Sequence, residues 1–351
     1  MLEFYKNKKV LITGHNGFKG SWLTLILKHL GAKIIGVSLK LDKNHSKKNL
    51  INIFKLKNEI REYFIDINDF TKLKKTIIKE QPDIIFHLAA QSLVYEAVKS
   101  PLKNYHTNII GLINVLESLK YTKKTKFVSI ITSDKCYVND EKKNLRESDQ
   151  LGGDDPYSAS KACAEIISKS YFKTYFDKNL NIYTFRGGNV IGGGDFLSTR
   201  LVPDLINFVY NNQKLILRNT NSSRPWQNVL DVLFSYLLYS EILYKKNIRF
   251  ENMNIGPNKS YKVEKILKYF TDHYDLKIKY GIDFNKKDIE KKYLKLNCEK
   301  SKKYFNFRRM PFDKSLKKTF HWYDSFFLKE NMRIFSINEI IEYINNYIQD
   351  K

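Results

Sequence analysis

Residues 9–20 read Lys-Val-Leu-Ile-Thr-Gly-His-Asn-Gly-Phe-Lys-Gly, a short apolar run that leads into three glycines. An apolar run of this kind is typical of a strand buried on both faces of a parallel sheet. Residues 21–30 follow with the apolar pattern of a helix packed on a sheet. A strand, a GxxGxxG loop and a helix in this order predict a dinucleotide site.

Each glycine of this loop has a separate expected role. Gly14 permits the tight turn after the strand, and Gly17 lets the backbone approach a pyrophosphate. Gly20 lets the helix pack closely on the sheet, and the N-terminus of that helix then faces the anion. An alternative is that the glycines mark an ordinary turn. The dinucleotide site is favoured because the loop follows a predicted strand and leads into a predicted helix.

The same alternation of strands and helices continues through the first half of the chain. Strands are predicted over 9–14, 32–39, 62–67, 84–90, 127–132 and 181–185, and helices over 21–30, 70–80, 105–121 and 156–176. This rhythm predicts an α/β fold with a doubly wound parallel sheet and helices on both faces. After about Gly187 the rhythm becomes irregular, which predicts a smaller C-terminal α/β lobe.

We therefore expect a dinucleotide-binding domain over 1–188 and a substrate lobe made mainly of 189–351. Segments such as 226–256 are expected to return to the first domain, with a helix over 231–244. The length of 351 residues suits two domains or one elaborated domain. Hydrophobic residues make up 42% of the chain and aromatic residues 14%, which excludes bulk disorder.

The cysteines and the apolar runs indicate the compartment. Cys136, Cys163 and Cys298 lie far apart, with neither zinc spacing nor enough cysteines for a disulfide scaffold. We expect no metal site and a reducing cytoplasm. No apolar run reaches the ~20 residues of a membrane helix, and the N-terminal segment has no signal-peptide core. A soluble protein with no membrane partner is predicted.

The charge of the chain has two interpretations. Lys plus Arg number 61 and Asp plus Glu 37, which gives a formal net charge of +24. One interpretation is a polyanionic partner such as nucleic acid. The other is a lysine-rich solvated surface. The excess is scattered lysine, and no cluster of arginines with aromatics is present, which favours the second interpretation. We expect no nucleic-acid partner, although a small anionic substrate remains compatible.

The ends of the second and third predicted strands bear on the choice of cofactor. An acid at the end of the second strand would bind the ribose 2′-OH of NAD. This chain has Ser38-Leu39-Lys40 there, and its first acid is Asp42, so NAD and NADP both stay open. Asp66, at the end of the third strand, would lie near the adenine or act as an acid at the N-terminus of the next helix.

Tyr157 and Lys161 are four residues apart, so they share one face of the helix predicted to start at Pro156. A tyrosine acts as a base near neutral pH only if its pKa falls from about 10. A neighbouring ammonium group and a cationic nicotinamide would stabilise the phenolate. The alternative is a surface Tyr–Lys pair.

The end of the fifth predicted strand carries a second polar group of residues. Ser133, Asp134 and Lys135 follow it with a hydroxyl, a carboxyl and an amine in consecutive positions. Ligands of open parallel sheets bind outside the carboxyl ends of the strands. The alternative, a polar transition from strand to loop, is less favoured because the Tyr157–Lys161 pair follows in the chain.

At this point the chain resembles the extended short-chain dehydrogenases/reductases of the nucleotide-sugar epimerase/dehydratase family, and within it the CDP-glucose 4,6-dehydratases. The motifs that carry the resemblance span nearly the whole chain in order: TGHNGFKGSWL (13–23), HLAAQ (87–91), TNIIG (107–111), TSDKCY (132–137), GGDDPYSASK (152–161), RGGNVIGGGD (186–195), RPWQNVLD (224–231), NIGP (254–257) and YLKLNCEKSK (293–302). The resemblance implies a Rossmann-type sheet.

The resemblance also implies a reaction. Enzymes of this group take hydride from C4 of a nucleotide-hexose onto bound NAD⁺, eliminate water across C5–C6 and return the hydride to C6. By resemblance, Tyr157 would accept the O4 proton and Ser133 would hold O4. Asp134 would protonate the leaving 6-hydroxyl, which requires a raised pKa, and Lys135 would remove the C5 proton. Simple epimerases lack this acid/base pair. The pathway implied is deoxysugar synthesis for a surface polysaccharide.

Binding roles follow by the same resemblance. The residues expected to bind the cofactor, NAD, are Gly14, Asn16, Gly17, Phe18, Lys19, Gly20, Ser38, Asp66, Ile67, Leu88, Ala89, Ala90, Thr107, Asn108, Tyr157 and Lys161. The residues expected to bind the nucleotide-sugar are Gln91, Ser133, Asn189, Arg200, Leu201 and Arg224. A homodimer through the helices at 105–121 and 156–176 is also implied.

The sequence departs from the CDP-glucose group in one place. After HLAAQ the group usually reads Pro-Leu-Val-Arg, with Ser-Tyr two residues on, whereas this chain has Tyr95 and Val98 at the arginine and tyrosine positions. Another nucleotide-hexose is therefore an alternative substrate. The remaining alternatives are a nucleotide-sugar 4-epimerase or 4-reductase, and a non-catalytic dinucleotide-binding module.

Overall fold

The computed structural model describes residues 2–41, 48–138, 144–176, 178, 180–217, 220, 222–257, 259–278, 281–282, 293–306 and 308–348. Asp42 lies outside these ranges. The centre of the fold is a seven-stranded sheet whose strands are all parallel, in the order β11-β6-β5-β4-β1-β2-β3. Its strands are β1 (Lys9–Thr13), β2 (Lys33–Ser38), β3 (Arg61–Phe64), β4 (Ile84–His87), β5 (Phe127–Ile131), β6 (Asn181–Gly187) and β11 (Phe250–Ile255).

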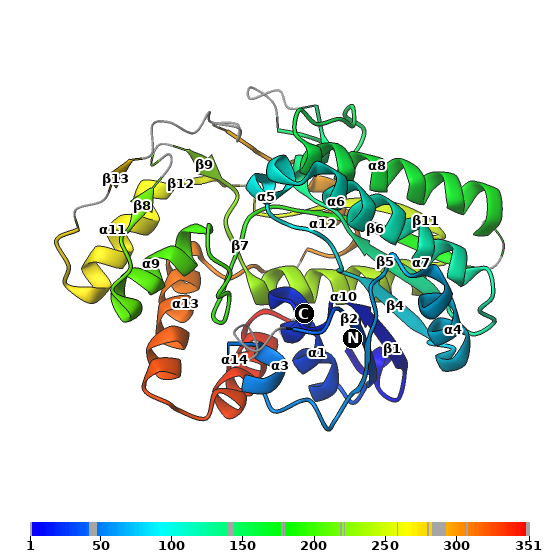
Figure 1. Ribbon diagram of the computed structural model, residues 1–351, viewed down its shortest axis with the longest axis horizontal. Helices are drawn as coiled ribbons and strands as arrows, with labels where there is room; N and C mark the ends of the chain where they lie inside the picture. The colour runs from blue at the N-terminus through cyan, green and yellow to red at the C-terminus, as the bar shows by residue number, and fades with distance from the viewer. Residues whose placement is uncertain are drawn as a thin grey trace.

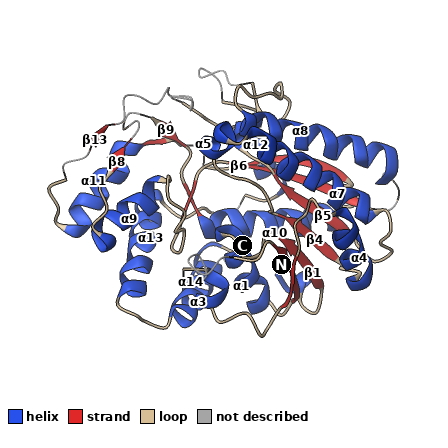
Figure 2. Ribbon diagram, viewed as in Figure 1, coloured by secondary structure: helices blue, strands red, loops and turns tan. Residues whose placement is uncertain are grey.

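Both faces of the sheet are covered by helices, as the continuous apolar strands require (Figures 1 and 2). In β1, Val10 and Ile12 point into a core that includes the helices α1 (Phe18–His29) and α10 (Val229–Lys245), while Leu11 points into a second core. The second core includes the helices α4 (Phe70–Glu80), α7 (Gly111–Leu119) and α8 (Pro156–Tyr171). Successive residues of one strand therefore join the two helical layers.

The strand order reverses direction between β1 and β4. The chain winds outward from β1 through β2 to β3, returns to β4 beside β1, and then winds the other way through β5 and β6. A crevice at the carboxyl ends of the strands forms at such a switch point. This topology confirms the predicted doubly wound parallel sheet.

The C-terminal half contributes both to a second lobe and to the sheet. The strand β11 adds to the sheet edge beside β6, and α10 packs under the sheet. The lobe, at the left of Figure 1, holds α9 (Leu201–Asn211), α11 (Val263–Tyr274) and α13 (Phe312–Phe327). Three two-stranded pairs accompany it: β7 (Val190–Ile191) with β10 (Gln227–Asn228), β9 (Ser223–Arg224) with β12 (Tyr261–Lys262), and β8 (Ile216–Leu217) with β13 (Gly281–Ile282).

The remaining elements are short helices and the C-terminal helix. They are η1 (Leu2–Tyr5), α3 (Leu50–Ile53), α5 (Val94–Lys99), α6 (Pro101–Tyr105), η2 (His106–Ile110), η3 (Asp134–Cys136), η4 (Phe172–Phe176), α12 (Glu299–Tyr304) and α14 (Met332–Tyr347). None of the helices in the described part of the chain combines the length and the apolarity needed to cross a membrane.

The predicted strands and helices of the first half are all present. The helix expected over 105–121 is divided, since α6 leads into the π-helical turn η2 and only then into α7. The helix expected over 156–176 likewise ends in the π-helical turn η4. Such turns interrupt regular helix geometry without breaking the helix.

Candidate active site

A cavity of about 1340 Å³ opens between the carboxyl ends of the strands and the C-terminal lobe. Most of the predicted site residues line it: Gly14, Asn16, Gly17, Phe18, Lys19, Gly20, Ser38, Asp66, Ile67, Leu88, Ala89, Ala90, Thr107, Ser133, Asp134, Lys135, Tyr157, Asn189, Arg200, Leu201 and Arg224. The three others, Gln91, Asn108 and Lys161, are not among the lining residues. The fold therefore brings segments from both halves of the chain around one space.

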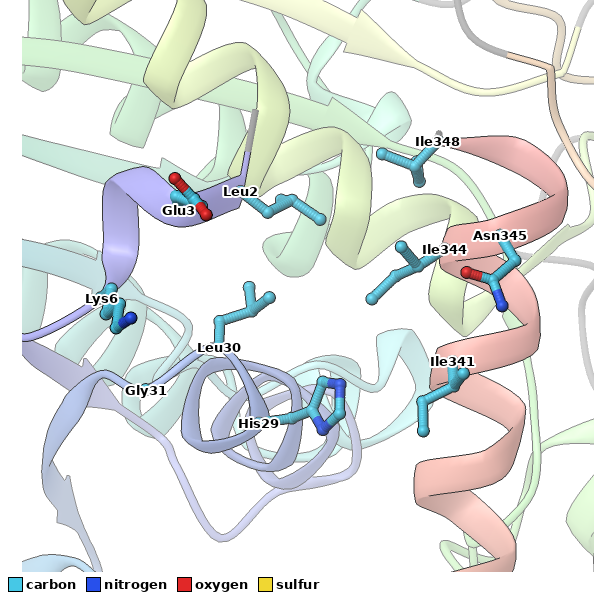
Figure 3. A pocket seen from close by; sticks show the side chains of 10 residues that line it. All are labelled: Leu2, Glu3, Lys6, His29, Leu30, Gly31, Ile341, Ile344, Asn345 and Ile348. Atoms are coloured by element: carbon cyan, nitrogen blue, oxygen red, sulfur yellow. The ribbon is translucent and has the colours of Figure 1, made fainter. Parts of the chain in front are cut away.

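A second cavity of about 710 Å³ lies between η1, the end of α1 and α14. Figure 3 shows its wall, which contains Leu30, Ile341 and Ile344 with His29 at the edge. None of the predicted site residues lines it. The candidate active site is therefore the larger cavity.

The glycine-rich loop has the geometry expected for a diphosphate cradle. Gly14 has a φ of +72°, and a Cβ added to it would lie 2.8 Å from the amide nitrogen of Ala89. A Cβ on Gly20 would lie 2.1 Å from the carbonyl oxygen of Gly14. The N-cap of α1 is Gly17, which has no side chain to cap the first turn. The N–H groups at the first turn of a helix are suited to an anionic ligand.

The wall expected to face the adenosine contains an unpaired hydroxyl. Ser38, at the end of β2, is 5% exposed, and its Oγ has no hydrogen-bond partner among the described residues. Asn16 reaches across this wall, because its side-chain amide donates to the carbonyl oxygen of Leu39 at 2.8 Å. Asp66 accepts from the backbone and side chain of Asn68, so it caps the turn before α4. A dinucleotide with a ribose hydroxyl beside Ser38 fits this wall, since a buried hydroxyl normally has a partner.

The residues that follow strand β5 place a hydroxyl, a carboxyl and an amine at the wall of the cavity. Ser133 caps the turn η3, accepting from the amide of Lys135 at 3.3 Å, and its hydroxyl donates to Asp134 at 3.1 Å. Asp134 is 2% exposed, so its carboxyl group is removed from bulk water. Tyr157 shares a hydrogen bond with Ser133, which links α8 to this turn. Four of the five predicted catalytic residues thus line the same part of the cavity.

Lys161 lies one turn along α8, with its ammonium group 6.0 Å from the centre of the Tyr157 ring. It donates a hydrogen bond to the carbonyl oxygen of Ile131 at 3.1 Å. Burial lowers the pKa of Lys161 to about 8, and the nearby Glu165 carboxylate partly opposes that change.

The pKa of Tyr157 differs from the sequence-based expectation. Burial raises it to about 12, while the hydrogen bond with Ser133 and the charge of Arg200 act in the other direction. The groups of the protein alone therefore do not lower this pKa, because the loss of hydration outweighs the cations around the ring.

Sequence reasoning missed a buried ion pair behind the turn that carries Ser133. Glu165 of α8 and Arg186 of β6 are 3% and 1% exposed and lie 2.8 Å apart. Glu165 also accepts from Thr132, the neighbour of Ser133, at 2.5 Å and from Thr184 at 2.7 Å. This network fixes the strand end that carries Ser133. The spacing of 21 residues between the partners gives no periodic signal, although a charged residue inside an apolar strand is itself a hint.

His87 and Thr13 stiffen the adjacent strand ends. The hydroxyl of Thr13 lies 2.8 Å from Nδ1 of His87 and accepts from the amide of Ala89 at 3.2 Å. Burial and the charge of Lys161 lower the pKa of His87 to about 3, so this ring stays neutral. It therefore orders the loop after β4 without adding charge.

The partly buried Gln91 and the buried Asn108 are joined by hydrogen bonds behind the same loop. The amide of Gln91 donates to Oδ1 of Asn108 at 2.8 Å, and Nδ2 of Asn108 donates to the carbonyl oxygen of Gln91 at 3.0 Å and to Ser160 at 2.9 Å. Asn104 donates to the side chain of Gln91 at 2.7 Å. Both residues are placed to position the wall of the cavity from behind.

Two arginines approach the cavity from the C-terminal lobe. Arg200, at the N-cap of α9, donates to Asp195 at 2.7 Å and to Ser92 at 2.9 Å, so it bridges the loops of the two halves. Arg224 is 5% exposed and donates to the carbonyl oxygen of Ser223 at 3.0 Å. Guanidinium groups are suited to a diphosphate. The lining residues Tyr95, Trp226 and Val263 were not among the predicted binding residues.

The chain resembles known proteins along most of its length. A family model described as GDP-mannose 4,6 dehydratase matches residues 11–333. The chain is 36% identical to a CDP-glucose 4,6-dehydratase of Salmonella typhimurium, over 98% of this chain and 98% of that protein. It is 32% identical to a dTDP-D-glucose 4,6-dehydratase of Dictyostelium discoideum, over 71% of this chain and 58% of that protein.

Solved structures agree on the fold. A UDP-glucose 4-epimerase of Thermotoga maritima, crystallised with UDP-glucose, has a TM-score of 0.78 at 21% identity and covers 91% of this chain and 99% of its own. A UDP-glucose 4-epimerase of Stenotrophomonas maltophila with bound NAD has a TM-score of 0.79 at 18% identity and covers 91% of this chain. The fold, the cavity and the sequence matches over nearly the whole chain agree, and the chain belongs to the family of nucleotide-sugar 4,6-dehydratases.

Proposed function

We propose that the protein converts CDP-glucose to CDP-4-keto-6-deoxyglucose. The observation that carries this proposal is the convergence of Ser133, Asp134, Lys135 and Tyr157 on one cavity, at the carboxyl end of β5 and the start of α8. The relative that is 36% identical over nearly the whole chain bears the same activity in its name.

The cofactor proposed is NAD, held by the cradle around Gly14 and Gly20 with Ser38 at the adenosine side. When bound, NAD⁺ supplies an acceptor for the C4 hydride and a donor of the same hydride to C6. The neutral Ser38 hydroxyl brings no negative charge that would repel a 2′-phosphate, so NADP is the alternative that a binding measurement has to exclude.

The protein residues move the protons. Tyr157 Oη is proposed to accept the proton of the substrate O4, with Ser133 Oγ as the hydrogen-bond donor that holds O4. Lys135 Nζ is proposed to remove the C5 proton, which a ketone at C4 makes acidic. Asp134 is proposed to give its proton to the leaving 6-hydroxyl, so water leaves and the C5–C6 bond becomes double.

Three residues of the C-terminal half are proposed to hold the substrate diphosphate and its surroundings. Arg200 and Arg224 supply guanidinium donors and Asn189 supplies an amide, and all three line the cavity. Leu201 is proposed to contact the nucleoside as the first residue of α9.

One observation supports a second candidate substrate. Tyr95 lines the cavity, and the ammonium group of Lys99 lies 4.3 Å from the centre of its ring. An aromatic side chain at a position where an arginine would be expected for CDP-glucose changes the surface offered to the sugar or the base. A different nucleotide-hexose is therefore the second candidate, with the chemistry unchanged.

We also propose a homodimer through α6, α7 and α8, which lie side by side on one face of the sheet (Figure 1). Large apolar residues of this layer are exposed: Leu102 by 70%, Tyr105 by 36%, Ile110 by 41% and Ile166 by 57%. Apolar side chains gathered in this way are typical of a subunit interface. Light scattering of the protein and of an Ile166→Asp variant tests this proposal, which a monomeric parent protein would overturn.

A substrate panel tests the proposed reaction. Purified protein is incubated with NAD and, separately, with CDP-glucose, dTDP-glucose, UDP-glucose and GDP-mannose, and products are followed by mass and proton NMR. The expected product has lost one water and shows a new C6 methyl signal, and in deuterated water it carries solvent deuterium at C5. A product of unchanged mass would identify an epimerase, and no 4-keto-6-deoxy product from any sugar would overturn the proposal.

A further inference from the structure

His15, which lies between the first two glycines of the loop, is a buried histidine held by a carboxylate. Its side chain is 0% exposed, and its Nε2 lies 2.8 Å from Oε1 of Glu62 in β3. Its Nδ1 has no hydrogen-bond partner among the residues that the structure describes. Because an ionised carboxylate only accepts hydrogen bonds, Nε2 carries a proton and donates to Glu62.

The ring of His15 lies across strand β2 to reach Glu62. Gly36 of β2 pairs directly with Glu62 of β3, so these two residues share one face of the sheet. A Cβ added to Gly36 would lie 2.5 Å from two carbon atoms of the His15 ring and 2.7 Å from its Nδ1. The glycine at position 36 therefore makes the room that the ring occupies.

The backbone of His15 is held as closely as its ring. The carbonyl oxygen of His15 accepts from the hydroxyl of Ser21 at 3.1 Å, and a Cβ added to Gly20 would lie 2.8 Å from the Cα of His15. The amide of Gly14 donates to the carbonyl oxygen of Val37 in β2 at 2.7 Å. A shift of the ring would therefore displace the backbone of the loop.

The next residue holds the side of the loop that faces the cavity. Asn16 lines the cavity, and its side-chain amide donates to the carbonyl oxygen of Leu39 at 2.8 Å. Its carbonyl oxygen accepts from the side chain of Asn49 at 2.7 Å. The loop is thus fixed by contacts at the cavity wall and by the buried contact of His15 with β3.

Fold stability alone explains the buried contact poorly. An apolar side chain at position 15 would fill the same space without leaving a buried nitrogen unpaired. The glycine that makes room for the ring also weakens an interior strand of the sheet. Both features are explained if the ring sets the shape of the loop that meets the dinucleotide.

We propose that His15 is a positioning residue for the dinucleotide, and that its hydrogen bond to Glu62 holds the glycine loop in the conformation that binds the cofactor. His15 acts through the loop backbone, since it does not line the cavity. The inference rests on the proposed function for the cofactor, NAD. It goes beyond that function because it assigns roles to His15, Glu62 and Gly36, which are not among the expected binding residues.

Loss of the contact should weaken cofactor binding and leave substrate binding unchanged. We expect His15→Ala to bind NAD about tenfold more weakly, because a loop that is not held in advance has to be ordered on binding. The residues proposed to bind the nucleotide-sugar do not contact His15, so the affinity for CDP-glucose should stay that of the parent.

Calorimetric titration of protein freed of bound nucleotide, with NAD, NADP and CDP-glucose in separate arms, tests the proposal. His15→Ala removes the ring, and Glu62→Ala removes its partner. His15→Gln keeps an amide donor near the position of Nε2, and Glu62→Gln keeps an acceptor without the charge. His29→Ala, at the exposed end of α1, is the matched control, and melting temperatures verify that each variant is folded.

The two alanine variants should bind NAD more weakly, whereas the two glutamine variants should retain most of the affinity. The double variant His15→Ala with Glu62→Ala should bind NAD no more weakly than His15→Ala, because the two residues act through one contact. His29→Ala should bind NAD as the parent does.

Gly36→Ala provides an independent test, because its effect should depend on the residue at position 15. In the parent the new methyl group would lie 2.5 Å from the ring, so the NAD affinity should fall. In His15→Ala the ring is gone, so Gly36→Ala should cause no further loss of affinity. A ring that served only fold stability would change the melting temperatures of this series and leave the NAD affinity of the folded protein unchanged.

Parent-like NAD affinity of His15→Ala, or additive losses in the double variant, would overturn the inference. Equal weakening of NAD and CDP-glucose binding would overturn it too, because that result indicates a general loss of structure. A parent protein that binds neither NAD nor NADP would overturn the proposed cofactor and this inference with it. The titrations require no turnover, so a failed dehydration assay is distinct from a failure of the inference about His15.

Discussion

The ammonium group of Lys161 donates a hydrogen bond of 3.1 Å to the carbonyl oxygen of Ile131, the last residue of β5. This contact ties α8 to the strand that carries Ser133, Asp134 and Lys135 into the cavity. The helix therefore cannot shift along the sheet without losing a buried charged hydrogen bond, which holds Tyr157 beside Ser133. This contact between a helix residue and a strand end brings the two sequence motifs, Ser133–Lys135 and Tyr157 with Lys161, into one site.

Tyr157→Phe is expected to abolish most of the activity while leaving the fold intact. The proposed acceptor of the O4 proton is removed, and general-base catalysis accounts for about 10²- to 10⁴-fold in rate. We expect kcat to fall by that factor, with binding of CDP-glucose changed little. Steady-state kinetics and calorimetry measure the two quantities. Tyr175→Phe, at an exposed position on the turn that extends α8, is the control, and equal loss in both variants would contradict the assignment.

Lys135→Met is expected to separate oxidation at C4 from elimination of water. The proposed base for the C5 proton is missing, whereas Tyr157 and Ser133 remain in place. Protein mixed with NAD and CDP-glucose should accumulate enzyme-bound NADH, seen as absorbance at long ultraviolet wavelength, without a C6 methyl signal in the NMR spectrum. Lys169→Met, on the exposed side of α8, controls for loss of a lysine. Full turnover by Lys135→Met would show that another group removes the proton.

Lys161→Met is expected to inactivate the protein and to remove a pH-dependent cost from the stability of its fold. Burial lowers the pKa of Lys161 from 10.5 to about 8, and a difference of that size corresponds to at most about 3 kcal/mol of destabilisation. Below pH 8 both folded and unfolded chains hold the proton, so the parent protein bears the full cost. Between about pH 8 and 10.5 only the unfolded chain holds it, so the stability of the parent rises with pH.

Thermal melting from pH 7 to 10 measures this effect. The melting temperature of the variant relative to that of the parent should be highest at pH 7 and should fall by a few degrees towards pH 10. Lys19 contributes a rise of the same sign from about pH 7, and the raised pKa of Tyr157 acts in the opposite direction above pH 10. A constant difference over the whole range would contradict the electrostatic origin of the effect.

Gly20→Ala is expected to prevent cofactor binding and to destabilise the fold. The new methyl group would lie 2.1 Å from the carbonyl oxygen of Gly14, which is backbone and cannot rotate away. Forcing extra atoms into a closely packed site costs about 1–3 kcal/mol. Melting curves and NAD titration test both parts. Gly256→Ala is the control, because its Cβ would make only ordinary contacts, at 3.6 Å or more.

An element of this fold can be predicted from the sequence where the interactions that form it are local. The helix α4 has the predicted bounds, 70–80, because its signals are local: Asp69 caps the amide of Lys72, and the apolar residues recur at helical spacing. The two-residue strands of the C-terminal half leave no such pattern. The strands β7 and β10, for example, join segments whose pairing is decided by the packing of α10 and not by their own residues.

The residues of the candidate site also divide into local motifs, which the sequence predicts, and features that depend on tertiary packing. The glycine loop and the Tyr157–Lys161 pair could be recognised because each lies within one turn or one loop. The pKa of Tyr157 could not be predicted, since it depends on how deeply several separate segments bury the ring. The hydrogen bond between Arg200 and Ser92 could not be predicted either, because the two residues are 108 positions apart and meet only across the cavity.

The buried pair of Glu165 and Arg186 leads to the last prediction. Arg186→Met leaves the Glu165 carboxylate in an apolar environment with hydrogen bonds from Thr132 and Thr184 but without its counter-ion. Loss of one partner from such a pair costs about 3–5 kcal/mol, far more than the net contribution of the pair itself.

The double variant Glu165→Gln with Arg186→Met should recover part of this loss, because no charge then remains buried. Lys72→Met, which breaks the exposed pair with Asp69, should hardly change the stability. Urea unfolding of the parent, of the single variants Arg186→Met and Glu165→Gln, of the double variant and of Lys72→Met measures these differences. A double variant as unstable as the sum of its single variants would contradict the argument. Since Thr132 adjoins Ser133, the single variant should also lower kcat under conditions where it is fully folded.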